Sequence, residues 1–299
     1  MTETTTATTT TGDGRTLAFC QWGDPDGFPI FSLHGTPGSR LGRHPDEDVY
    51  RRARVRAITY DRAGYGESTR HPGRRVADVA ADVSAIADQL GLGRFAVMGG
   101  SGGGPHALAC GALLADRVTR CASVVGVAPC GDGGLPREQW LAGMVEGNVR
   151  EFEWALAGED TLRPELERER DELLASLESD SRDALGEDYK LSDQDAEVMQ
   201  RSDIRATLAT STKEGIGRSV DGMVDDDLAF TAPWGFDVAA MRTPTAVWYG
   251  PHDTLVPARH GEWLSQTIPG AEAVRLEGGH FAIYDRMSEL LAWLSRDQA

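Results

Sequence analysis

The sequence has few of the residues that mark disulfide-rich, zinc-binding or membrane proteins. Only four of its 299 residues are cysteine, and none forms a C-x-x-C pair. This pattern predicts no metal site and fits a reduced, cytoplasmic protein. No run of about 18 apolar residues occurs, so no membrane-spanning helix is expected. The threonine-rich start lacks the basic and apolar stretches of a signal peptide, and we expect a disordered tail over residues 1–13.

Basic residues are also scarce. Lys and Arg number 30 against 47 Asp and Glu, for a formal net charge of −17. This balance argues against nucleic acids and anionic membranes as partners. Residues 136–230 alone hold 25 acidic and 11 basic residues. A solvated helical surface is the main interpretation of this segment, and a field that attracts cationic substrates is the alternative.

What the sequence does contain is a G-x-S-x-G pentapeptide at Gly99–Gly103, with Ser101 at its centre. The apolar run Phe95–Met98 precedes it, and the small residues of Pro105–Cys110 follow it. Strand, tight turn and helix in this order predict a nucleophile elbow, which presents the serine hydroxyl at the end of a strand. The alternative is a phosphate-binding loop, but the lysine and the glycine spacing of the known phosphate motifs are missing.

A serine hydroxyl needs a base to take its proton and an acid to orient that base. In enzymes with such an elbow the chain order is serine, acid, histidine. Asp253 follows the apparent strand Thr245–Gly250, and His280 follows the apparent strand Ala273–Leu276. This joint placement predicts the triad Ser101, Asp253 and His280.

Other residues compete for these roles. An aspartate in a turn is often an Asx-turn residue. His252, His34 and His106 are rival bases, because each lies close in sequence to the expected active face. The alternative acid position, after the strand Ala122–Val125, offers no carboxylate nearby.

Two further loops complete a family pattern. The H-G-T-P-G loop His34–Gly38 follows an early strand, and Asp61–Ser68 reads D-R-A-G-Y-G-E-S. With the elbow and the two partner loops, they make the chain resemble the α/β-hydrolase superfamily, in particular its cap-bearing branch. The resemblance covers residues 14–130 and 231–296. It implies that the backbone N–H groups of Thr36 and Gly102 form an oxyanion hole.

Each of these loops also has a plain structural interpretation. The segment at residues 34–38 could be an ordinary proline-glycine turn. We interpret Asp61–Ser68 as a structural turn, although Asp61 and Arg62 could pair near the floor of the pocket.

Strand patterns alternate with helix patterns along the chain, which predicts a mostly parallel, doubly wound α/β sheet. The expected strands are Thr16–Trp22, Pro29–Leu33, Val55–Tyr60, Arg94–Met98, Thr119–Val125, Thr245–Tyr249 and Ala273–Leu276. The expected helices are Arg75–Leu90, Ser101–Ala115, Ala258–Ile268 and Phe281–Ser295. Residues 14–130 and 231–299 would form the core.

Residues 131–230 have no strand pattern, and we expect them to form an inserted helical lid. Apolar residues recur at helical spacing from Trp140 through Met144 to Leu156, and they would form an apolar underside. Packing within the lid explains such a stripe, and a pocket ceiling is the functional alternative. The segment Leu162–Leu177 is expected to be an exposed helix with its own ion pairs. The candidate pocket residues are His34, Gly35, Trp140, Met144 and Trp234.

The triad predicts acyl transfer through an acyl-enzyme, with no metal and no cofactor. Serine at position 101 argues against epoxide hydrolases and haloalkane dehalogenases, which use a carboxylate there. We expect hydrolysis of a small to medium apolar ester by a monomer or homodimer, with a small-molecule substrate as the partner.

Two other activities stay open. Gly99-Gly100-Ser101 resembles the opening of proline iminopeptidases, although Gly102 replaces their tryptophan. The superfamily also includes carbon–carbon lyases and cyclases, because a fold does not define a reaction.

Overall fold

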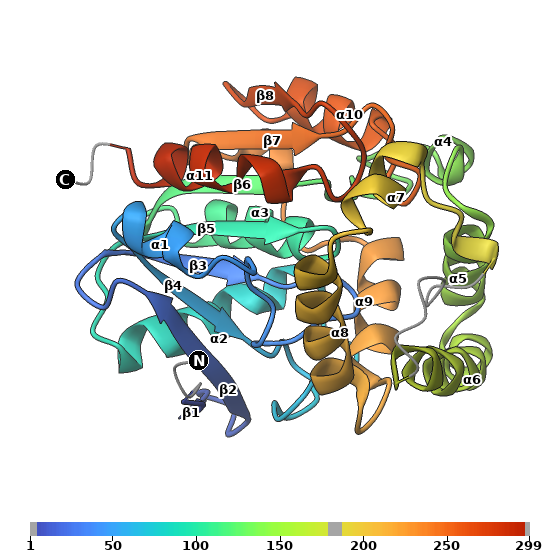
Figure 1. The fold of residues 1–299 in the computed structure, drawn as a ribbon, viewed down its shortest axis with the longest axis horizontal. Helices are drawn as coiled ribbons and strands as arrows, with labels where there is room; N and C mark the ends of the chain where they lie inside the picture. Colours follow the sequence, from blue (N-terminus) through green and yellow to red (C-terminus); the bar gives the residue numbers. More distant parts are fainter. Residues whose placement is uncertain (1–4, 179–186, 297–299) are drawn as a thin grey trace.

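The computed structural model describes residues 5–178 and 187–296. Its centre is an eight-stranded sheet in the order β1-β2-β4-β3-β5-β6-β7-β8 (Figure 1). The pairs β1–β2 and β2–β4 are antiparallel, and the other neighbours are parallel. The mostly parallel sheet expected from the alternating pattern is therefore confirmed. The strands are β1 (Ala7–Thr10), β2 (Thr16–Gly23), β3 (Phe28–Leu33), β4 (Val55–Tyr60), β5 (Phe95–Gly100), β6 (Val118–Val124), β7 (Thr245–Tyr249) and β8 (Glu272–Arg275).

The N-terminal segment differs from the prediction of a disordered tail over residues 1–13. Residues 7–10 form β1, which pairs with β2 from Ala7 opposite Phe19 to Thr10 opposite Thr16. Threonine is β-branched and favours extended backbone when a partner strand is available. The threonine-rich composition favoured the prediction of disorder, whereas pairing with β2 orders this segment as a strand. Residues 1–4 of the predicted tail lie outside the described residues.

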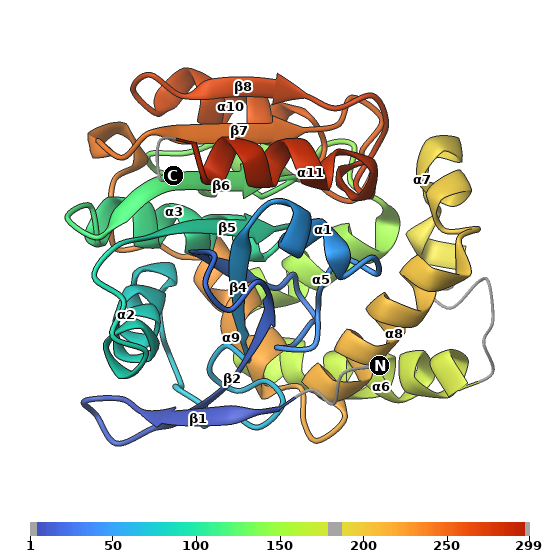
Figure 2. The ribbon, with the colours of Figure 1, turned by 60° about the vertical axis from the view of Figure 1, so that its left-hand side comes forward.

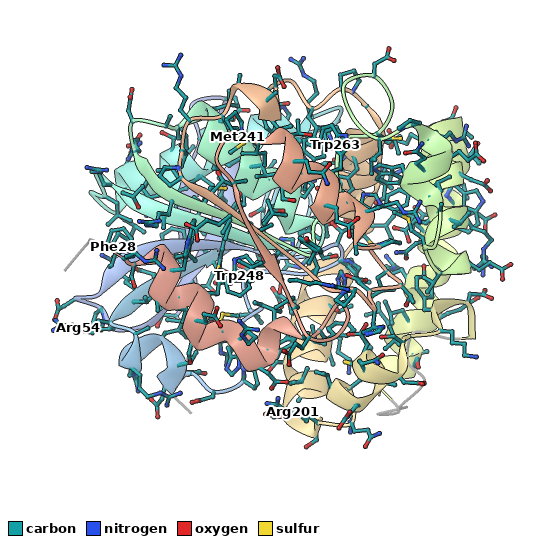
Figure 3. All side chains as sticks on the ribbon, turned by 90° about the horizontal axis from the view of Figure 1, so that it is seen from above. Phe28, Arg54, Arg201, Met241, Trp248 and Trp263 are labelled. Carbon is teal, nitrogen blue, oxygen red and sulfur yellow. The ribbon has the colours of Figure 1, made fainter. Side chains whose placement is uncertain are left out.

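Helices cover both faces of the sheet (Figures 1 and 2). One face packs against α1 (Asp48–Arg52) and α11 (Ile283–Leu294), and Trp248 of β7 lies in this layer. The other packs against α2 (Val79–Gln89), α3 (Gly103–Leu113) and α10 (Arg259–Thr267), with Met241 and Trp263. Figure 3 shows Trp248 on the opposite side of the sheet from Met241 and Trp263. Short 3₁₀ turns, η1 (Val76–Asp78) and η3 (Val238–Ala240), stand before α2 and β7.

The segment between β6 and β7 is a helical insertion. It contains α4 (Arg137–Leu141), α5 (Glu146–Ala157), α6 (Glu159–Glu178), the 3₁₀ turn η2 (Glu187–Tyr189), α7 (Asp193–Val198), α8 (Ser202–Ile216) and α9 (Asp221–Thr231). Figure 1 shows these helices grouped at the end of the molecule toward which β5 points. The insertion therefore lies over the carboxyl edge of the parallel strands, where α/β folds place their ligands.

The apolar stripe predicted from Trp140 to Leu156 is divided between two helices. Helix α4 ends at Leu141, and α5 begins at Glu146. Gly143, with φ of +83°, lies in the break. Helix α6 covers the predicted helix Leu162–Leu177 and bears the expected ion pairs, such as Arg168 with Glu172 at 3.0 Å. None of the described helices combines the length and the apolar character needed to cross a membrane.

Candidate active site

Ser101 stands at the turn between β5 and α3. Its φ of +53° is in the left-handed region that non-glycine residues rarely adopt. Its backbone N–H donates to the carbonyl oxygen of Val124 at 2.9 Å. A side chain at Gly99 would collide with the backbone of Gly103. A side chain at Gly103 would collide with the backbone of Leu33. The glycines therefore let strand and helix approach closely enough to hold this strained turn.

Asp253 and His280 come from the loops that follow β7 and β8. Their side chains meet in a hydrogen bond of 2.7 Å between His280 Nδ1 and Asp253 Oδ2. The second carboxylate oxygen of Asp253 accepts from the backbone N–H groups of Leu255 at 2.9 Å and Val256 at 2.8 Å. Both side chains are buried. The carboxylate is thus fully bonded and orients the imidazole.

The electrostatic surroundings make His280 a stronger base than a free imidazole. Burial by itself would lower the pKa of His280. The charge of Asp253 and the hydrogen bond to it act in the opposite sense, with a further contribution from the charge of Asp195. The net effect is a raised pKa.

Ser101 and His280 line the same cavity, which has a volume of about 2080 Å³ and lies between the sheet edge and the insertion. Within the described residues no hydrogen bond joins their side chains. Catalytic hydrogen bonds are often long until a substrate is bound. The structure thus brings the three predicted triad residues to one place in the fold. In the same described part of the chain, no group of three His, Cys, Asp or Glu side chains could hold a metal ion.

The rival bases have other surroundings. His252 is exposed. His106 is buried in α3 and bonds through Nε2 to Asp226 at 2.9 Å. Burial lowers the pKa of His106 to about 4, although the charge of Asp226 opposes this effect. His34 bonds through Nδ1 to the carbonyl of Gly35 at 2.7 Å. Of these candidate bases, His280 is the one that pairs with Asp253.

The predicted oxyanion donors lie next to each other. A Cβ atom placed on Gly102 would be 3.1 Å from the backbone nitrogen of Thr36. Gly35 lies in the same loop, and a Cβ atom there would be 3.4 Å from that of Ser101. His34, Gly35, Thr36 and Gly102 all line the cavity. This loop therefore lies directly against the elbow.

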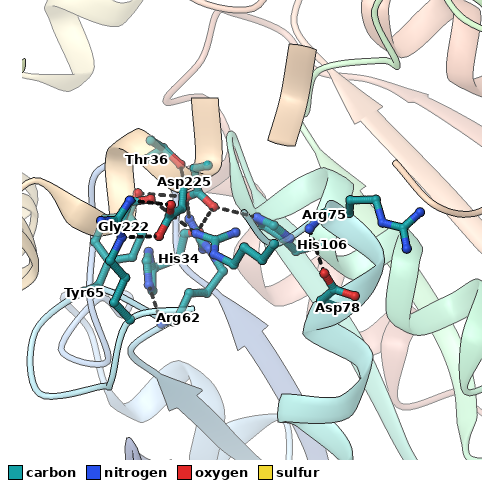
Figure 4. A network of polar contacts seen from close by, with 12 residues as sticks. His34, Thr36, Arg62, Tyr65, Arg75, Asp78, His106, Gly222 and Asp225 are labelled. Carbon is teal, nitrogen blue, oxygen red and sulfur yellow. Dashed lines mark hydrogen bonds and ion pairs between the residues drawn. The ribbon is translucent and has the colours of Figure 1, made fainter. Parts of the chain in front are cut away.

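A buried network that the sequence reasoning missed holds this loop. Asp226, in α9 of the insertion, accepts from five side chains. The donor–acceptor distances are 2.7 Å for Thr36 Oγ1, 2.5 Å for Arg62 Nη2, 2.8 Å for Tyr65 Oη, 2.6 Å for Arg74 Nη2 and 2.9 Å for His106 Nε2. Figure 4 shows Thr36, Arg62, Tyr65 and His106 converging from three different parts of the chain.

Charge explains the strength of this network. Burial would raise the pKa of Asp226, but Arg62 and Arg74 outweigh it and hold that pKa well below its usual range. Arg62 also donates to the carbonyl oxygens of His34 and, at 3.1 Å, of Gly35. One ionised carboxylate in the insertion thus fixes the loop after β3. The sequence signal was the triple acid Asp225–Asp227 in a helix whose other buried residues are mostly apolar or small.

The pairing of Asp61 also differs from the predicted possibility. Asp61 does not pair with Arg62; it binds Arg40, through the backbone N–H and Nη1, at 2.6 Å each. Arg62 binds Asp226 instead. The turn at residues 61–68 therefore joins two separate buried ion pairs, because its neighbouring side chains point in different directions.

Next to Asp226, the insertion places a second acidic group in the cavity. Asp227 of α9 and Glu151 of α5 both line it. Within the described residues, no basic or hydroxyl group donates to the side chain of Asp227, whose carboxyl group shares a hydrogen bond with that of Glu151. Burial and the neighbouring Glu151 raise the pKa of Asp227 well above its usual range. Burial, with Glu169 adding to it, raises the pKa of Glu151 to about 7.

Three candidate pocket residues do not line the cavity, which corrects the prediction for them. Trp140, Met144 and Trp234 belong to the main hydrophobic cluster and are 0%, 8% and 2% exposed. Trp140 donates through Nε1 to the carbonyl of Ala128 at 2.6 Å, and its ring packs edge-on against Phe152. Spacing along the sequence marked an apolar face correctly; at Trp140 and Met144 this face packs on the protein, whereas Phe152 in the same stripe lines the cavity.

Known proteins resemble this chain over different lengths. A proline iminopeptidase from Xylella fastidiosa (strain 9a5c) is 36% identical over 104 residues, which are 32% of this chain and 32% of that protein. This match thus spans about a third of the relative. A proline iminopeptidase from Neisseria gonorrhoeae is 26% identical over 300 residues, covering 92% of this chain and 90% of that protein.

Solved structures and a family profile extend the comparison. The enol-lactonase from Burkholderia xenovorans LB400 superposes with a TM-score of 0.67 at 18% identity, covering 96% of this chain and 98% of that one. At this identity the likeness shows the fold. The profile of the alpha/beta hydrolase fold matches residues 29–286. The chain belongs to the α/β-hydrolase family.

Proposed function

We propose that this hydrolase cleaves small to medium carboxylic esters with an apolar acyl group, through an acyl-enzyme on Ser101. The observation that carries the proposal is the 2.7 Å bond between His280 and Asp253, in the cavity that Ser101 also lines. A buried, bonded carboxylate holds the imidazole in one tautomer, with Nε2 directed away from it. This arrangement suits the removal of a proton from a serine hydroxyl.

The proposed reaction follows from these positions. Nε2 of His280 takes the proton of Ser101 as Oγ attacks the carbonyl carbon of the ester. The backbone N–H groups of Thr36 and Gly102 donate to the resulting oxyanion. The C–O bond then breaks, and His280 returns its proton to the leaving alcohol. A water molecule, deprotonated by His280, releases the acid and restores Ser101.

Apolar side chains near the elbow favour an apolar acyl group. They come from the segment after β6, from α9, from the loop after β7 and from the start of α11. Six that line the cavity are Val125, Val127, Met223, Phe230, Val256 and Ile283. We propose that the inserted helices act as a cap over these residues, limiting the water that reaches the acyl-enzyme.

The experiment is intact-mass analysis of wild type and Ser101→Ala after incubation with a fluorophosphonate, beside p-nitrophenyl esters of increasing acyl length. One adduct on the wild type alone, with ester turnover, is expected. The chain-length preference would then give the size of the acyl site. A folded wild type with neither adduct nor turnover would refute the proposal.

A second candidate activity, removal of an N-terminal residue from a peptide, is favoured by the acidic pair. Glu151 and Asp227 lie in the cavity, and among the described residues no Arg or Lys side chain forms an ion pair with either, so the pair lacks a compensating positive charge. A substrate α-ammonium group would supply that charge. The full-length similarity to proline iminopeptidases points in the same direction.

Prolyl-naphthylamide and a neutral naphthyl ester separate the two activities. If the pair binds an amine, Asp227→Asn raises KM for the amide at least tenfold and leaves KM for the ester within about twofold. Equal changes in KM for both substrates, or no amide turnover by the wild type, would refute the aminopeptidase activity and leave ester hydrolysis as the single proposal.

A further inference from the structure

Helix α7 of the insertion reaches the loop that carries His280. Its residue Asp195 accepts hydrogen bonds from two consecutive backbone N–H groups of that loop. Oδ2 accepts from His280 at 2.9 Å, and Oδ1 accepts from Phe281 at 2.8 Å. In Figure 1, α7 lies near the end of α11 that faces the insertion. One carboxylate of the insertion therefore binds two backbone N–H groups of the loop that contains His280.

Residues of α7 and of the His280 loop both support this contact. Asp195 is 0% exposed. The Ser192 hydroxyl, which caps α7, donates to Asp195 Oδ2 at 3.0 Å. On the other side, a Cβ atom on Gly279 would collide with Oδ2, so glycine is required there for the approach. A buried carboxylate with these donors is held in one place, since losing any of them would leave a buried acceptor unpaired.

The position of Asp195 also has an electrostatic effect. The charged groups that act on the His280 imidazole are Asp253, from the loop after β7, and Asp195, from α7. Burial opposes both, and the net pKa of His280 is raised. The carboxylate also lies just before the N-terminal end of α11, where negative charge is favourable.

We propose that Asp195 is a positioning residue: it fixes the backbone of His280 and thereby ties the placement of the catalytic base to the docking of the inserted helices. The inference rests on the proposed function, in which His280 is the base. In this arrangement, movement of α7 away from the sheet would release the histidine loop. Docking of the inserted helices and positioning of the His280 imidazole then occur together.

Two substitutions test this role, with one control. Asp195→Asn keeps the size of the side chain but removes its charge and replaces one acceptor by a donor. Asp195→Ala removes both contacts. Glu197→Gln makes the same change of charge on an exposed residue of α7, two positions along. The protonation of His280 is followed by NMR titration of its imidazole, assigned with His280→Gln, and kcat and KM are measured across pH.

Both Asp195 variants are expected to shift the His280 midpoint to lower pH, because a negative charge near the imidazole is lost. The acid limb of kcat moves in the same direction. At the optimum kcat falls about 100-fold, as for a misplacement of about 1 Å, while KM changes by less than about threefold. Glu197→Gln leaves the midpoint and kcat unchanged.

A His280 midpoint and kcat that are the same in Asp195→Asn, Glu197→Gln and wild type would overturn the inference. A loss of kcat without any shift in midpoint would reduce Asp195 to a general structural contact, and would overturn it as well. The NMR titration needs no turnover. A wild type that fails to react with a fluorophosphonate would therefore refute the proposed function without deciding the contact between Asp195 and His280.

Discussion

The carboxyl edge of the sheet and the helical insertion bury their carboxylates in different ways. At the sheet edge Asp253 accepts from the His280 ring and from two backbone N–H groups. In the insertion, consecutive residues of α9 have opposite surroundings. Asp226 accepts from five side chains, whereas the Asp227 carboxyl shares a hydrogen bond with the Glu151 carboxyl and, in the described part of the chain, has no basic or hydroxyl donor.

Partners, rather than burial, decide the charge of these groups. Burial would raise the pKa of both aspartates in α9. Two arginines reverse this effect at Asp226, and Glu151 reinforces it at Asp227. The first carboxylate is therefore held as an anion and organises a loop, whereas burial and Glu151 favour the neutral form of the second.

The sheet edge and the insertion also contribute different kinds of residue to the site. The proposed reacting groups come from the strand ends, while the insertion supplies carboxylates that hold their loops. Asp226 acts on the loop with Thr36, and Asp195 acts on the loop with His280. The insertion is thus part of the site and more than a cover over it.

The largest expected effect is at the sheet edge. Ser101→Ala should lower kcat for an ester about 10⁴–10⁶-fold, because the nucleophile is lost. Its thermal midpoint should stay within about 2 °C of wild type, because alanine adopts the left-handed turn as readily as serine does. Turnover and differential scanning calorimetry are measured on the same preparation. Turnover by Ser101→Ala at more than a tenth of the wild-type rate would place the chemistry elsewhere.

The next effect separates the two aspartates of α9. Asp226→Asn should cost about 3–5 kcal/mol in the free energy of unfolding, because Arg62 and Arg74 lose their buried counter-charge. Asp227→Asn, one residue along, should change it by less than about 1 kcal/mol, because an amide resembles a protonated carboxyl group. Urea denaturation at pH 7 measures both. Similar losses in the two variants would contradict the contrast between them.

A smaller effect depends on pH. The pKa of Glu151 is raised from 4.5 to about 7 in the folded state, so the folded protein holds this proton where the unfolded chain has lost it. The stability that this group contributes is present below about pH 4.5 and declines as pH rises toward 7. Glu151→Gln should therefore gain stability relative to wild type between pH 5 and pH 8.

Thermal unfolding across this range checks the sign. The matched control is Glu153→Gln, an exposed glutamate in the same helix. The difference in thermal stability between Glu153→Gln and wild type should stay constant from pH 5 to pH 8. A difference for Glu151→Gln that is constant from pH 5 to pH 8 would show that Glu151 is ionised throughout.

The smallest effect is on the surface of the insertion. Arg168 pairs with Glu172 one turn along α6, and both side chains are more than half exposed. Arg168→Gln should cost no more than about 0.5 kcal/mol, because solvent and salt screen such pairs. Urea denaturation compares it with Asp226→Asn. A loss above about 1 kcal/mol would show that solvent does not screen this surface pair as expected.

The strand-end loops could be predicted because local patterns define them. Strands β4 and β7 have the predicted bounds, Val55–Tyr60 and Thr245–Tyr249. Short apolar runs followed by glycine-rich turns reveal both the strand and the place where it ends. Since parallel strands end at one edge, Ser101, Asp253 and His280 could be grouped before the fold was known.

The insertion was less predictable because its contacts are distant in sequence. Trp140 and Met144 had the spacing of an apolar face, but spacing does not tell what the face packs against. Asp226 bonds residues 120 to 190 positions away, and Asp195 bonds residues about 85 positions away. The run of three acids at Asp225–Asp227 is a local signal, but it does not tell which of the three is paired or with which residues.

The sequence by itself determined the alternating sheet, the elbow at Ser101 and the order in which its partners follow, because these depend on residues next to one another in the chain. Only the tertiary structure decided which carboxylates of the insertion carry a charge and which loops they hold. The charge of a buried group depends on the partners that surround it, and folding brings those partners from far along the chain.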